Sequence, residues 1–278
     1  MRDCAGGRAC GFVACEKWGA TTVQFAHPWH VDSPERCFFY HKTTLPGLGE
    51  VGGSWDLRDC IDAYLGNIDF SGKRVLDVGA ASGFLTFSME QRGADVVSYD
   101  LDDGANWDIV PHYRLSIEEM AKEKAVHSDA LLRLKRAYWL AHRLHGSKAK
   151  AFYGPVYDMP EQLGAFDIVM YGMIITHLRD PFQGLYMGAR LCRDTLVVSS
   201  MFPEHDASIA TWLPQPNNTD SIHMTGWWTP SIALVKQWLG VLGFDVVKIV
   251  ESYPQVQASD FNGGKRKCQT LVARRKSR

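Results

Sequence analysis

Short apolar runs alternate with helical patterns over most of the chain. Four runs have the length and the β-branched character of buried strands: 75–78, 96–100, 166–169 and 195–199. After the first run, apolar residues continue at helical spacing from Phe84 to Arg92, and Gly93 ends the pattern. Strands that alternate with helices in this way predict an α/β fold, in which helices cover both faces of a sheet.

The C-terminal part of the chain breaks this alternation. The pattern predicts a helix over 229–242 that ends at Gly243. Two apolar runs, 244–250 and 268–273, follow with no helical pattern between them. We therefore expect a Rossmann-like seven-stranded sheet that is completed by a reversed C-terminal β-hairpin.

The N-terminal part has a weaker pattern. We expect residues 1–37 to be a poorly ordered or irregular segment, because Cys, Gly, Ala and Arg are mixed there without a clear period. Residues 38–71 contain a loop rich in Pro and Gly and a helical pattern over 55–65, and we expect them to form a lid. Residues 38–278 are then one domain, because 278 residues with 46% hydrophobic content suffice for one large core.

Two segments are longer than the connections of a minimal α/β fold. Residues 102–150 form an insertion, in which 116–145 have a helical pattern with an apolar face. The other side of this helix is basic. We interpret it as a solvated face rather than an RNA-binding stripe, because the net charge of the chain is −1. Residues 201–229 form a long loop with several tryptophans, and we expect this loop to contact substrate.

The first strand leads into a helix through a turn without bulky side chains. The turn consists of small residues: Gly79, Ala80, Ala81, Ser82 and Gly83. A ligand can approach the backbone of such a turn closely. The first strand contains an acid, Asp77, and the second strand ends in another, Asp100. An acid at that tip can accept both hydroxyls of a ribose, and the alternative is a solvated acid of a turn. No Lys followed by Ser or Thr comes after Gly83, so a phosphate-binding loop is not indicated.

This D-x-G-x-A-x-G pattern resembles motif I of the class I S-adenosylmethionine-dependent methyltransferases. The reversed terminal hairpin is a second similarity, since a dehydrogenase domain lacks it. The cofactor of this family is cationic and has no phosphate, which suits a carboxylate near the loop. The resemblance implies a cofactor site with Asp77, Gly79, Ala80, Ala81 and Gly83 at the amino-acid end, Asp100 at the ribose, Leu101, Val156 and Tyr157 at the adenine, and Tyr171 and Gly172 where the cofactor and the acceptor meet.

Residues 174–181 resemble a loop that occurs in many small-molecule and RNA methyltransferases. We expect its histidine, His177, to be either a general base for an acceptor hydroxyl or amine, or a structural residue that binds a backbone carbonyl. We further expect His41 in the lid and Trp228 in the long loop to contact the substrate, Trp228 by stacking on a ring or a base.

Composition and cysteine spacing bear on the expected cellular location of the protein and on metal binding. No apolar run approaches the ~20 residues that span a bilayer, and the first residues lack the apolar centre of a signal peptide. Seven cysteines are scattered without a C-x-x-C pair, which favours a reducing cytoplasm. We expect no metal site, because the His27-Pro28-Trp29-His30 segment has no carboxylate or thiol to complete a ligand set.

Residues from about 38 to 250 also resemble a subgroup, the tRNA wobble-uridine carboxymethyl-transferring enzymes and their uncharacterised relatives. Tyr40-His41, the Pro- and Gly-rich loop and the Trp55-Asp56-Leu57-Arg58 run carry this similarity. We expect a cytoplasmic enzyme that transfers a methyl group from S-adenosylmethionine to a small-molecule acceptor. The alternatives are a tRNA wobble base that receives a methyl or carboxymethyl group, a non-catalytic S-adenosylmethionine-binding protein and, most distantly, a nucleotide dehydrogenase.

Overall fold

The structure is a computed structural model that describes residues 23–102, 107–220, 224–257 and 263–277. The first 22 residues of the N-terminal segment, with Cys4, Cys10 and Cys15, lie outside the described residues. So do residues 221–223 of the long loop.

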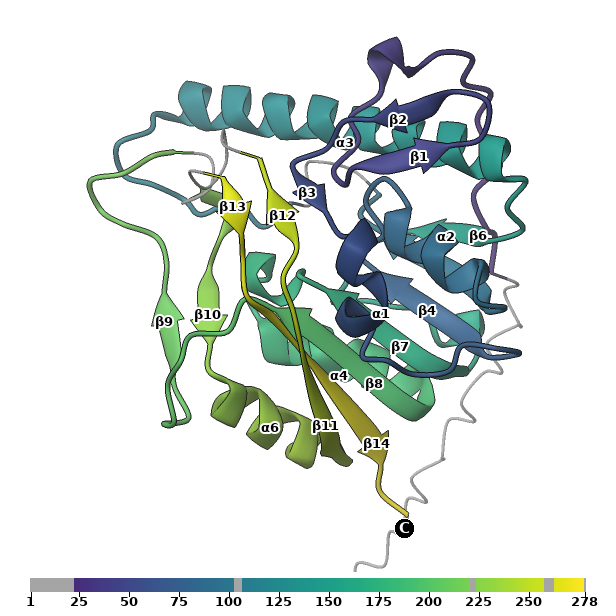
Figure 1. The fold of residues 1–278 in the computed structure, drawn as a ribbon. Coiled ribbons are helices and arrows are strands. Elements are labelled where there is room, and N and C mark those ends of the chain that lie inside the picture. Colours follow the sequence, from purple (N-terminus) through teal and green to yellow (C-terminus); the bar gives the residue numbers. More distant parts are fainter. Residues whose placement is uncertain (1–22, 103–106, 221–223, 258–262, 278) are drawn as a thin grey trace, which may run out of the picture.

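A seven-stranded sheet forms the centre of the molecule (Figure 1). Its strands lie in the order β11 (Phe244–Ser252), β14 (Cys268–Arg275), β8 (Cys192–Ser200), β7 (Phe166–Gly172), β4 (Arg74–Val78), β5 (Asp95–Asp100) and β6 (Lys150–Tyr153). The five strands from β8 to β6 are parallel, whereas β14 pairs antiparallel with both β8 and β11. The predicted seven-stranded sheet and its reversed C-terminal hairpin are confirmed.

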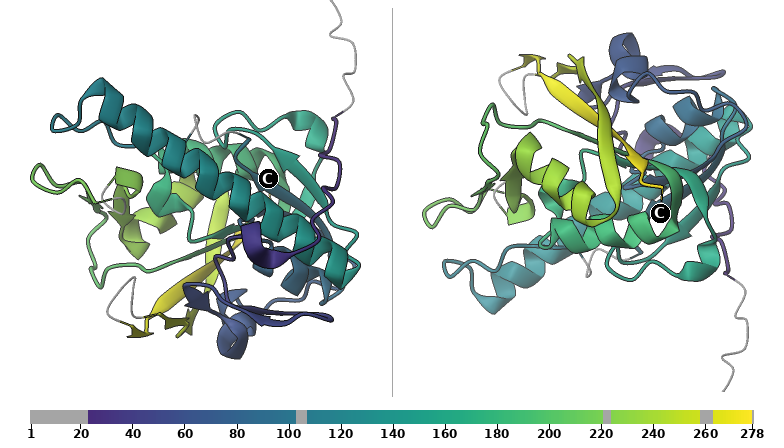
Figure 2. Two further views of the ribbon diagram at one scale, coloured as in Figure 1. Left: turned by 90° about the horizontal axis from the view of Figure 1, so that it is seen from above. Right: turned by 90° about the horizontal axis from the view of Figure 1, so that it is seen from below.

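Helices cover both faces of the sheet, because alternate residues of each buried strand point to opposite sides. Leu76 and Val78 of β4 pack in one cluster with α4 (Pro181–Leu191) and α6 (Ile232–Val241). Val75 points to the other face, where α1 (Ile61–Tyr64) and α2 (Phe84–Glu90) lie. On that face α3 (Ile117–His145) packs against α2 and β6. The two further views in Figure 2 show α3 crossing the molecule diagonally.

The long helix α3 has the signals that its sequence predicts at both ends. Ser116 and Glu119 form a capping box at its start, and Gly146 ends it with a φ of 61°. Its N-terminal end projects beyond the sheet (Figure 2), and Ile117 there is 92% exposed. The insertion therefore adds several helical turns without adding to the core at that end.

The N-terminal segment contains less helix than its pattern predicts. After η1 (Pro34–Arg36), the strands β1 (Thr43–Leu45) and β2 (Gly49–Val51) form a hairpin. The expected helix over 55–65 is wrong in its first part: β3 (Trp55–Asp56) and the short turn η2 (Arg58–Cys60) precede α1. The strand β3 pairs with β12 (Gln255–Val256), which also pairs with β13 (Gly264–Lys265), so a distant partner decides this conformation.

The long loop also differs from the expectation. It contains β9 (Ala210–Trp212) and β10 (Trp228–Pro230), which pair antiparallel, so the helix predicted over 229–242 begins only at Ile232. The strand β6 and the short turns η4 (Glu161–Leu163) and η5 (Ile175–His177) complete the described elements near the candidate site. Among the described helices, none combines the length and the apolar character needed to cross a membrane.

Candidate active site

The strand β4 lies at the point where the direction of the chain across the sheet reverses. From β4 the chain continues to β5 and β6 on one side, and then returns to β7 on the other side. Ligands of open α/β sheets bind at the carboxyl ends of the strands at such a point. The loops after β4, β5, β6 and β7 all meet there.

The turn after β4 needs its glycines for two physical reasons. Gly79 and Gly83 have φ values of 81° and 87°, a region that favours glycine. A Cβ atom at Gly83 would also lie 2.4 Å from the ring of Phe87 and 2.9 Å from that of Tyr138, and one at Gly79 would lie 2.8 Å from Ile174. The small residues therefore make room for neighbouring side chains as well as for a ligand.

Asp100 at the tip of β5 is tied to this turn. Its carboxylate accepts a hydrogen bond from the amide of Ala81 over 2.6 Å and one from the amide of Leu101 over 2.7 Å. Burial raises the pKa of Asp100, while both amides and the nearby Lys135 counteract that rise. Two backbone donors leave further lone pairs of the carboxylate for a ligand. The predicted pairing of the small-residue turn with Asp100 is thus present in the structure.

Asp77 lies beneath the turn and is fully buried. Its Oδ2 accepts a hydrogen bond from the hydroxyl of Thr86 in α2 over 2.6 Å. Its Oδ1 is buried and has no hydrogen-bond partner among the described residues. Burial raises the pKa of Asp77 to about 7, and the bond from Thr86 acts in the opposite direction. The residue expected at the amino-acid end of a cofactor is therefore a buried carboxyl group with one oxygen bonded to Thr86 and the other without a partner among the described residues.

The segment after β6 contacts Asp100, the acid predicted to bind the ribose, through its backbone. The amide of Gly154 donates to the carbonyl of Asp100 over 2.9 Å, so this segment begins beside the tip of β5. Val156 and Leu101 are half-buried there. The hydroxyl of Tyr157 donates to Asp108 and accepts from the amide of Asp180 over 3.2 Å. The phenol of Tyr157 thus holds two loops together, which leaves its ring and backbone for the predicted adenine contact.

The tip of β7 is placed differently from the expectation in one respect. The side chain of Tyr171 is fully buried, and its hydroxyl donates to the carbonyl of Gly184 over 2.8 Å and accepts from the amide of Gly188 over 3.1 Å. It therefore attaches α4 to the sheet and does not face the candidate site. Gly172 is the last residue of β7, and a Cβ atom there would lie 2.4 Å from Leu85 of α2.

His177 lies at the end of η5 beside the segment that precedes β10. Its Nδ1 lies 2.9 Å from the carbonyl oxygen of Thr225, and the amide of Trp227 donates to the carbonyl of Thr176 over 2.8 Å. A carbonyl can only accept, so Nδ1 carries the proton and Nε2 keeps its lone pair. Burial lowers the pKa of His177, which favours this neutral form. The geometry combines the two expected roles, because a structural bond at Nδ1 leaves Nε2 able to accept a proton.

His41 lies against the start of α2. The amide of the preceding residue, Tyr40, donates to Ser82 Oγ of the turn over 3.1 Å, and the His41 ring lies 5.4 Å from the ring of Phe84. Its Nδ1 is buried without a partner among the described residues. Burial lowers the pKa of His41 to about 3, so the ring is neutral. The lid therefore brings one neutral imidazole to the small-residue turn.

Trp228 lies further from the turn, on β10. Its indole N–H donates to the carbonyl of Arg179 over 3.0 Å, and its ring packs edge-on against Trp212 with 4.7 Å between centroids. Trp212 is 43% exposed, whereas Trp227 is buried with its indole N–H on the carbonyl of Asp108. The aromatic group is therefore oriented by backbone carbonyls and keeps part of its surface open.

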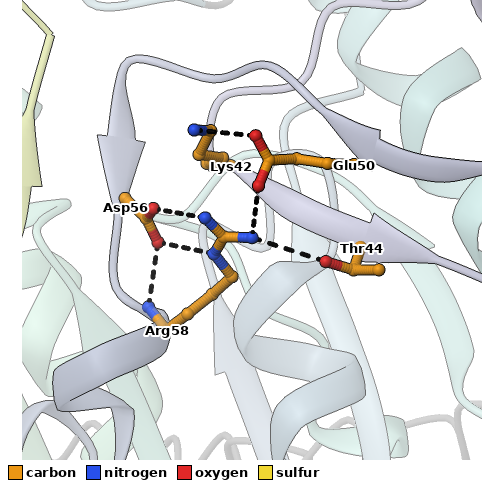
Figure 3. Close-up of polar contacts among 5 residues, drawn as sticks. All are labelled: Lys42, Thr44, Glu50, Asp56 and Arg58. Atoms are coloured by element: carbon orange, nitrogen blue, oxygen red, sulfur yellow. Dashed lines mark hydrogen bonds and ion pairs between the residues drawn. The ribbon is translucent and has the colours of Figure 1, made fainter.

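A network of charges holds the lid in shape, as Figure 3 shows. The guanidinium of Arg58 donates two bonds, of 2.8 Å and 2.6 Å, to the two oxygens of Asp56, and a third bond of 2.8 Å to Glu50. Glu50 also pairs with Lys42 over 2.8 Å. These bonds lower the pKa of Asp56 and connect the β1–β2 hairpin with β3 and η2.

Two residues near the candidate site were not predicted from the sequence to have a role there. Asp108 is one, because its carboxylate and carbonyl bind Tyr157, the Arg179 amide and Trp227. Lys135 is another: the expected solvated face includes it, yet it is buried and its ammonium donates to the carbonyl of Asp102. Neither residue belongs to a local motif. Within the parts of the chain that the structure describes, no three His, Cys, Asp or Glu side chains gather as metal ligands.

Relatives with named activities match about two thirds of the chain. A tRNA U34 carboxymethyltransferase of Azotobacter vinelandii is 27% identical over 194 residues, and one of Pseudomonas paraeruginosa is 26% identical over 193 residues. Each match covers 66% of this chain and 49% of the relative, so the chain spans about half the length of these relatives. The resemblance to class I S-adenosylmethionine-dependent methyltransferases is confirmed. No family model matches the chain.

A solved structure supports the fold assignment. The N-terminal domain of EvdMO1, crystallised in the presence of S-adenosylhomocysteine and D-fucose, aligns with a TM-score of 0.51 over 88% of this chain and 93% of that one. The sequences of the two domains are 16% identical. The fold is therefore shared with a protein of low sequence identity.

Proposed function

We propose that this protein binds S-adenosylmethionine and transfers its methyl group to a small-molecule acceptor. The observation that carries the proposal is the junction of two loops, where the amides of Ala81 and Leu101 hold the Asp100 carboxylate at the carboxyl end of β5. The Asp100 carboxylate keeps lone pairs that can accept hydrogen bonds from the two hydroxyls of a ribose. The relatives are named for the transfer of a carboxymethyl group, which supports group transfer as the general type of reaction.

The described residues fit this cofactor better than a phosphate-containing one. Asp77 and Asp100 are both acids, and the pKa of each is raised by burial, so a nearby cation would stabilise their ionised forms. A dinucleotide would place its pyrophosphate near these acids, which is unfavourable. When bound, S-adenosylmethionine supplies an activated methyl group on a sulfonium.

The protein then has to align the acceptor and accept its proton where there is one. His177 Nε2 is the group that the structure offers for the proton, because Nδ1 is occupied by Thr225. The neutral His41 ring lies beside the turn, in the lid. Both imidazoles are uncharged, and they suit an acceptor that is neutral or becomes anionic only as it reacts.

A small acceptor suits the aromatic loop. Trp228 has its ring edge fixed by the Arg179 carbonyl, and an oriented indole provides a flat surface for a sugar or an aromatic ring. The net charge of −1 provides no broad electrostatic attraction for a polynucleotide. We therefore favour a metabolite, a sugar or a natural-product intermediate.

A tRNA wobble base is the second candidate, because both relatives named above act on tRNA U34 according to their names. A carboxylated cofactor would need a cation for its additional carboxylate. Lys42 and Arg58 in the lid are both paired with acids of the lid itself. These pairs favour the unmodified cofactor over the carboxylated one.

Calorimetric titration of the purified protein with S-adenosylmethionine, S-adenosylhomocysteine and NAD tests the proposal. We expect micromolar binding of the first two and none of NAD. Binding of NAD alone would overturn the assignment. A radiolabelled methyl-transfer assay with unfractionated tRNA and with pooled small metabolites as acceptors then separates the two candidates.

A further inference from the structure

A chain of buried hydroxyl groups runs from α3 to Asp77. The Tyr138 hydroxyl lies 2.9 Å from Ser98 Oγ, Ser98 Oγ lies 2.8 Å from Thr86 Oγ1, and Thr86 Oγ1 lies 2.6 Å from Asp77 Oδ2. All four side chains are buried. They come from four elements, namely α3, β5, α2 and β4. We refer to them as the Tyr138–Asp77 chain.

The number of protons fixes the direction of these bonds. When Asp77 is ionised its Oδ2 can only accept, so the single hydroxyl proton of Thr86 points to it. Thr86 must then accept from Ser98, and Ser98 in turn must accept from Tyr138. The hydrogen bonds therefore all point toward Asp77 Oδ2. Such an array stabilises the carboxylate relative to the protonated acid.

The other oxygen of Asp77 is available to a group of a bound ligand. Oδ1 is buried and without a partner among the described residues. The pKa of Asp77 is shifted by burial, by the hydrogen bonds from Thr86 and by the Asp100 carboxylate. No described basic side chain contributes to this shift. The neighbouring Tyr138 of α3 and Tyr64 of α1 are neutral phenols. A buried carboxylate in this setting is stabilised by a cationic donor.

The same chain is in contact with the turn that follows β4. A Cβ atom at Gly83 would lie 2.9 Å from the Tyr138 ring, so this ring packs directly on the turn. A small cavity is lined by Ala81, Ser98, Asp100, Lys135 and Tyr138. The residues that orient Asp77 thus also border the site of Asp100.

We infer that Thr86, Ser98 and Tyr138 are positioning residues, which fix Asp77 Oδ2 so that Oδ1 receives the ammonium group of the bound cofactor. The inference rests on the proposed function, and it extends the site into α3. It gives the helical insertion a role in cofactor binding that no residue of a local motif indicates.

The test compares two identical substitutions at buried threonines. Thr86→Val removes the donor to Asp77. Thr270→Val removes a fully buried hydroxyl that bonds Ser199 and the Tyr64 carbonyl instead, and it serves as the matched control. Affinity for S-adenosylhomocysteine is measured by calorimetry between about pH 6 and pH 8.5, a range that brackets the ionisation of Asp77.

In the wild type we expect affinity to rise with pH through this range, because the cation binds the ionised carboxyl group and binding releases a proton near neutral pH. Thr86→Val raises the pKa of Asp77, so the rise in affinity moves to higher pH. At pH 7 the loss is about tenfold or more, the magnitude expected for a hydrogen bond to a charged group. Thr270→Val leaves the pH dependence where it is.

Tyr138→Phe is a milder second variant that should give a smaller shift in the same direction. NMR titration of the Asp77 carboxyl carbon in the free protein provides a readout that does not depend on binding. An equal loss for Thr86→Val and Thr270→Val at every pH, or an unchanged Asp77 titration in Thr86→Val, would overturn the inference while the proposed cofactor stands. Absence of binding by the folded wild type would instead reject the proposed function, and the inference with it.

Discussion

At the scale of single residues, the lone pairs of Asp100 decide whether the candidate site can hold a ribose. Asp100→Ala removes both possible bonds to ribose hydroxyls and the anchor of the Ala81 amide. We expect the affinity for S-adenosylhomocysteine to fall by about 1–3 kcal/mol, with the fold intact. Calorimetry measures this loss, and circular dichroism checks the fold.

Asp95→Ala is the matched control for this prediction. Asp95 begins the same strand at its other end, where its exposed carboxylate has only a loose 3.8 Å contact with Arg74. We expect its replacement to leave the affinity unchanged. If both variants bind alike, Asp100 is not part of the site.

The proposed role of His177 predicts a specific dependence on pH. Because burial lowers its pKa, the ring is neutral at pH 7 and able to accept a proton. Turnover should therefore be level around neutral pH and decline only when acidification protonates the ring. His177→Ala should lower kcat about 10²-fold or more if Nε2 is a general base.

His127→Ala is a suitable comparison for His177→Ala. His127 is also buried and also directs Nδ1 at a backbone carbonyl, that of Glu123, but it lies on α3 beside Trp107. The two variants lose the same kind of contact. A similar, small effect of both on kcat would leave His177 with its structural role alone.

Predictability at this scale depends on whether a residue belongs to a local motif. The small residues from Gly79 to Gly83 form one continuous pattern and Asp100 ends the next strand, and the structure places them together. Tyr171 belongs to the same kind of pattern, but the alternation of β7 turns its side chain into the core toward α4. Thr86, Ser98 and Tyr138 are distant in sequence, and only the packing of three elements reveals their contact.

At the scale of elements, the lid combines buried apolar side chains, such as Leu45, Leu57 and Leu65, with a network of charges. Arg58 joins the β1–β2 hairpin to β3 through Asp56 and Glu50. Arg58→Met removes the four hydrogen bonds that the guanidinium donates to Asp56, Glu50 and Thr44 but keeps most of the aliphatic side chain. We expect faster amide hydrogen exchange over 42–58, with a small change in the melting temperature of the whole domain, since partly exposed ion pairs contribute little to global stability.

Arg92→Met controls for the general effect of losing such a pair. Arg92 binds the exposed Asp62 of α1 with two bonds that are separate from the Arg58 network. Its replacement should leave exchange over 42–58 unchanged. Equal exchange in both variants, measured by mass spectrometry, would show that the network does not hold the lid.

The short elements were the ones that the sequence could not predict. The strands β3, β9 and β10 are two or three residues long, too short for a period to emerge. Each is paired with a segment that is distant in sequence or lies across a long loop. The helix α3, by contrast, has a capping box and a terminal glycine, and its predicted limits agree with the structure.

At the scale of the whole molecule, the sheet topology was predictable because five parallel strands need apolar residues on both faces and a terminal hairpin needs no crossover helix. The acceptor could not be predicted from the sequence, because a fold does not determine its substrate. The loops around His177 and Trp228, which we propose to face the acceptor, are held by carbonyls of Thr225 and Arg179. Backbone carbonyls are present at every residue, so the sequence carries no trace of these contacts.

The buried Asp77 also predicts how the stability of the whole molecule changes with pH. Its pKa is about 7 in the folded protein and near 3.8 when the chain is unfolded. The folded state therefore holds the proton more tightly, and stability is highest below the unfolded pKa and is lost as pH rises through the folded pKa. A pKa difference of about three units corresponds to at most about 4 kcal/mol in the free energy of unfolding.

The variant Asp77→Asn tests this dependence, because its side chain cannot titrate. The free energy of unfolding of the wild type relative to this variant should fall between about pH 4 and pH 8. Urea denaturation of both proteins across this range, without cofactor, measures the difference. A constant difference would mean that the pKa of Asp77 is the same in the folded and the unfolded protein, and that burial does not raise it.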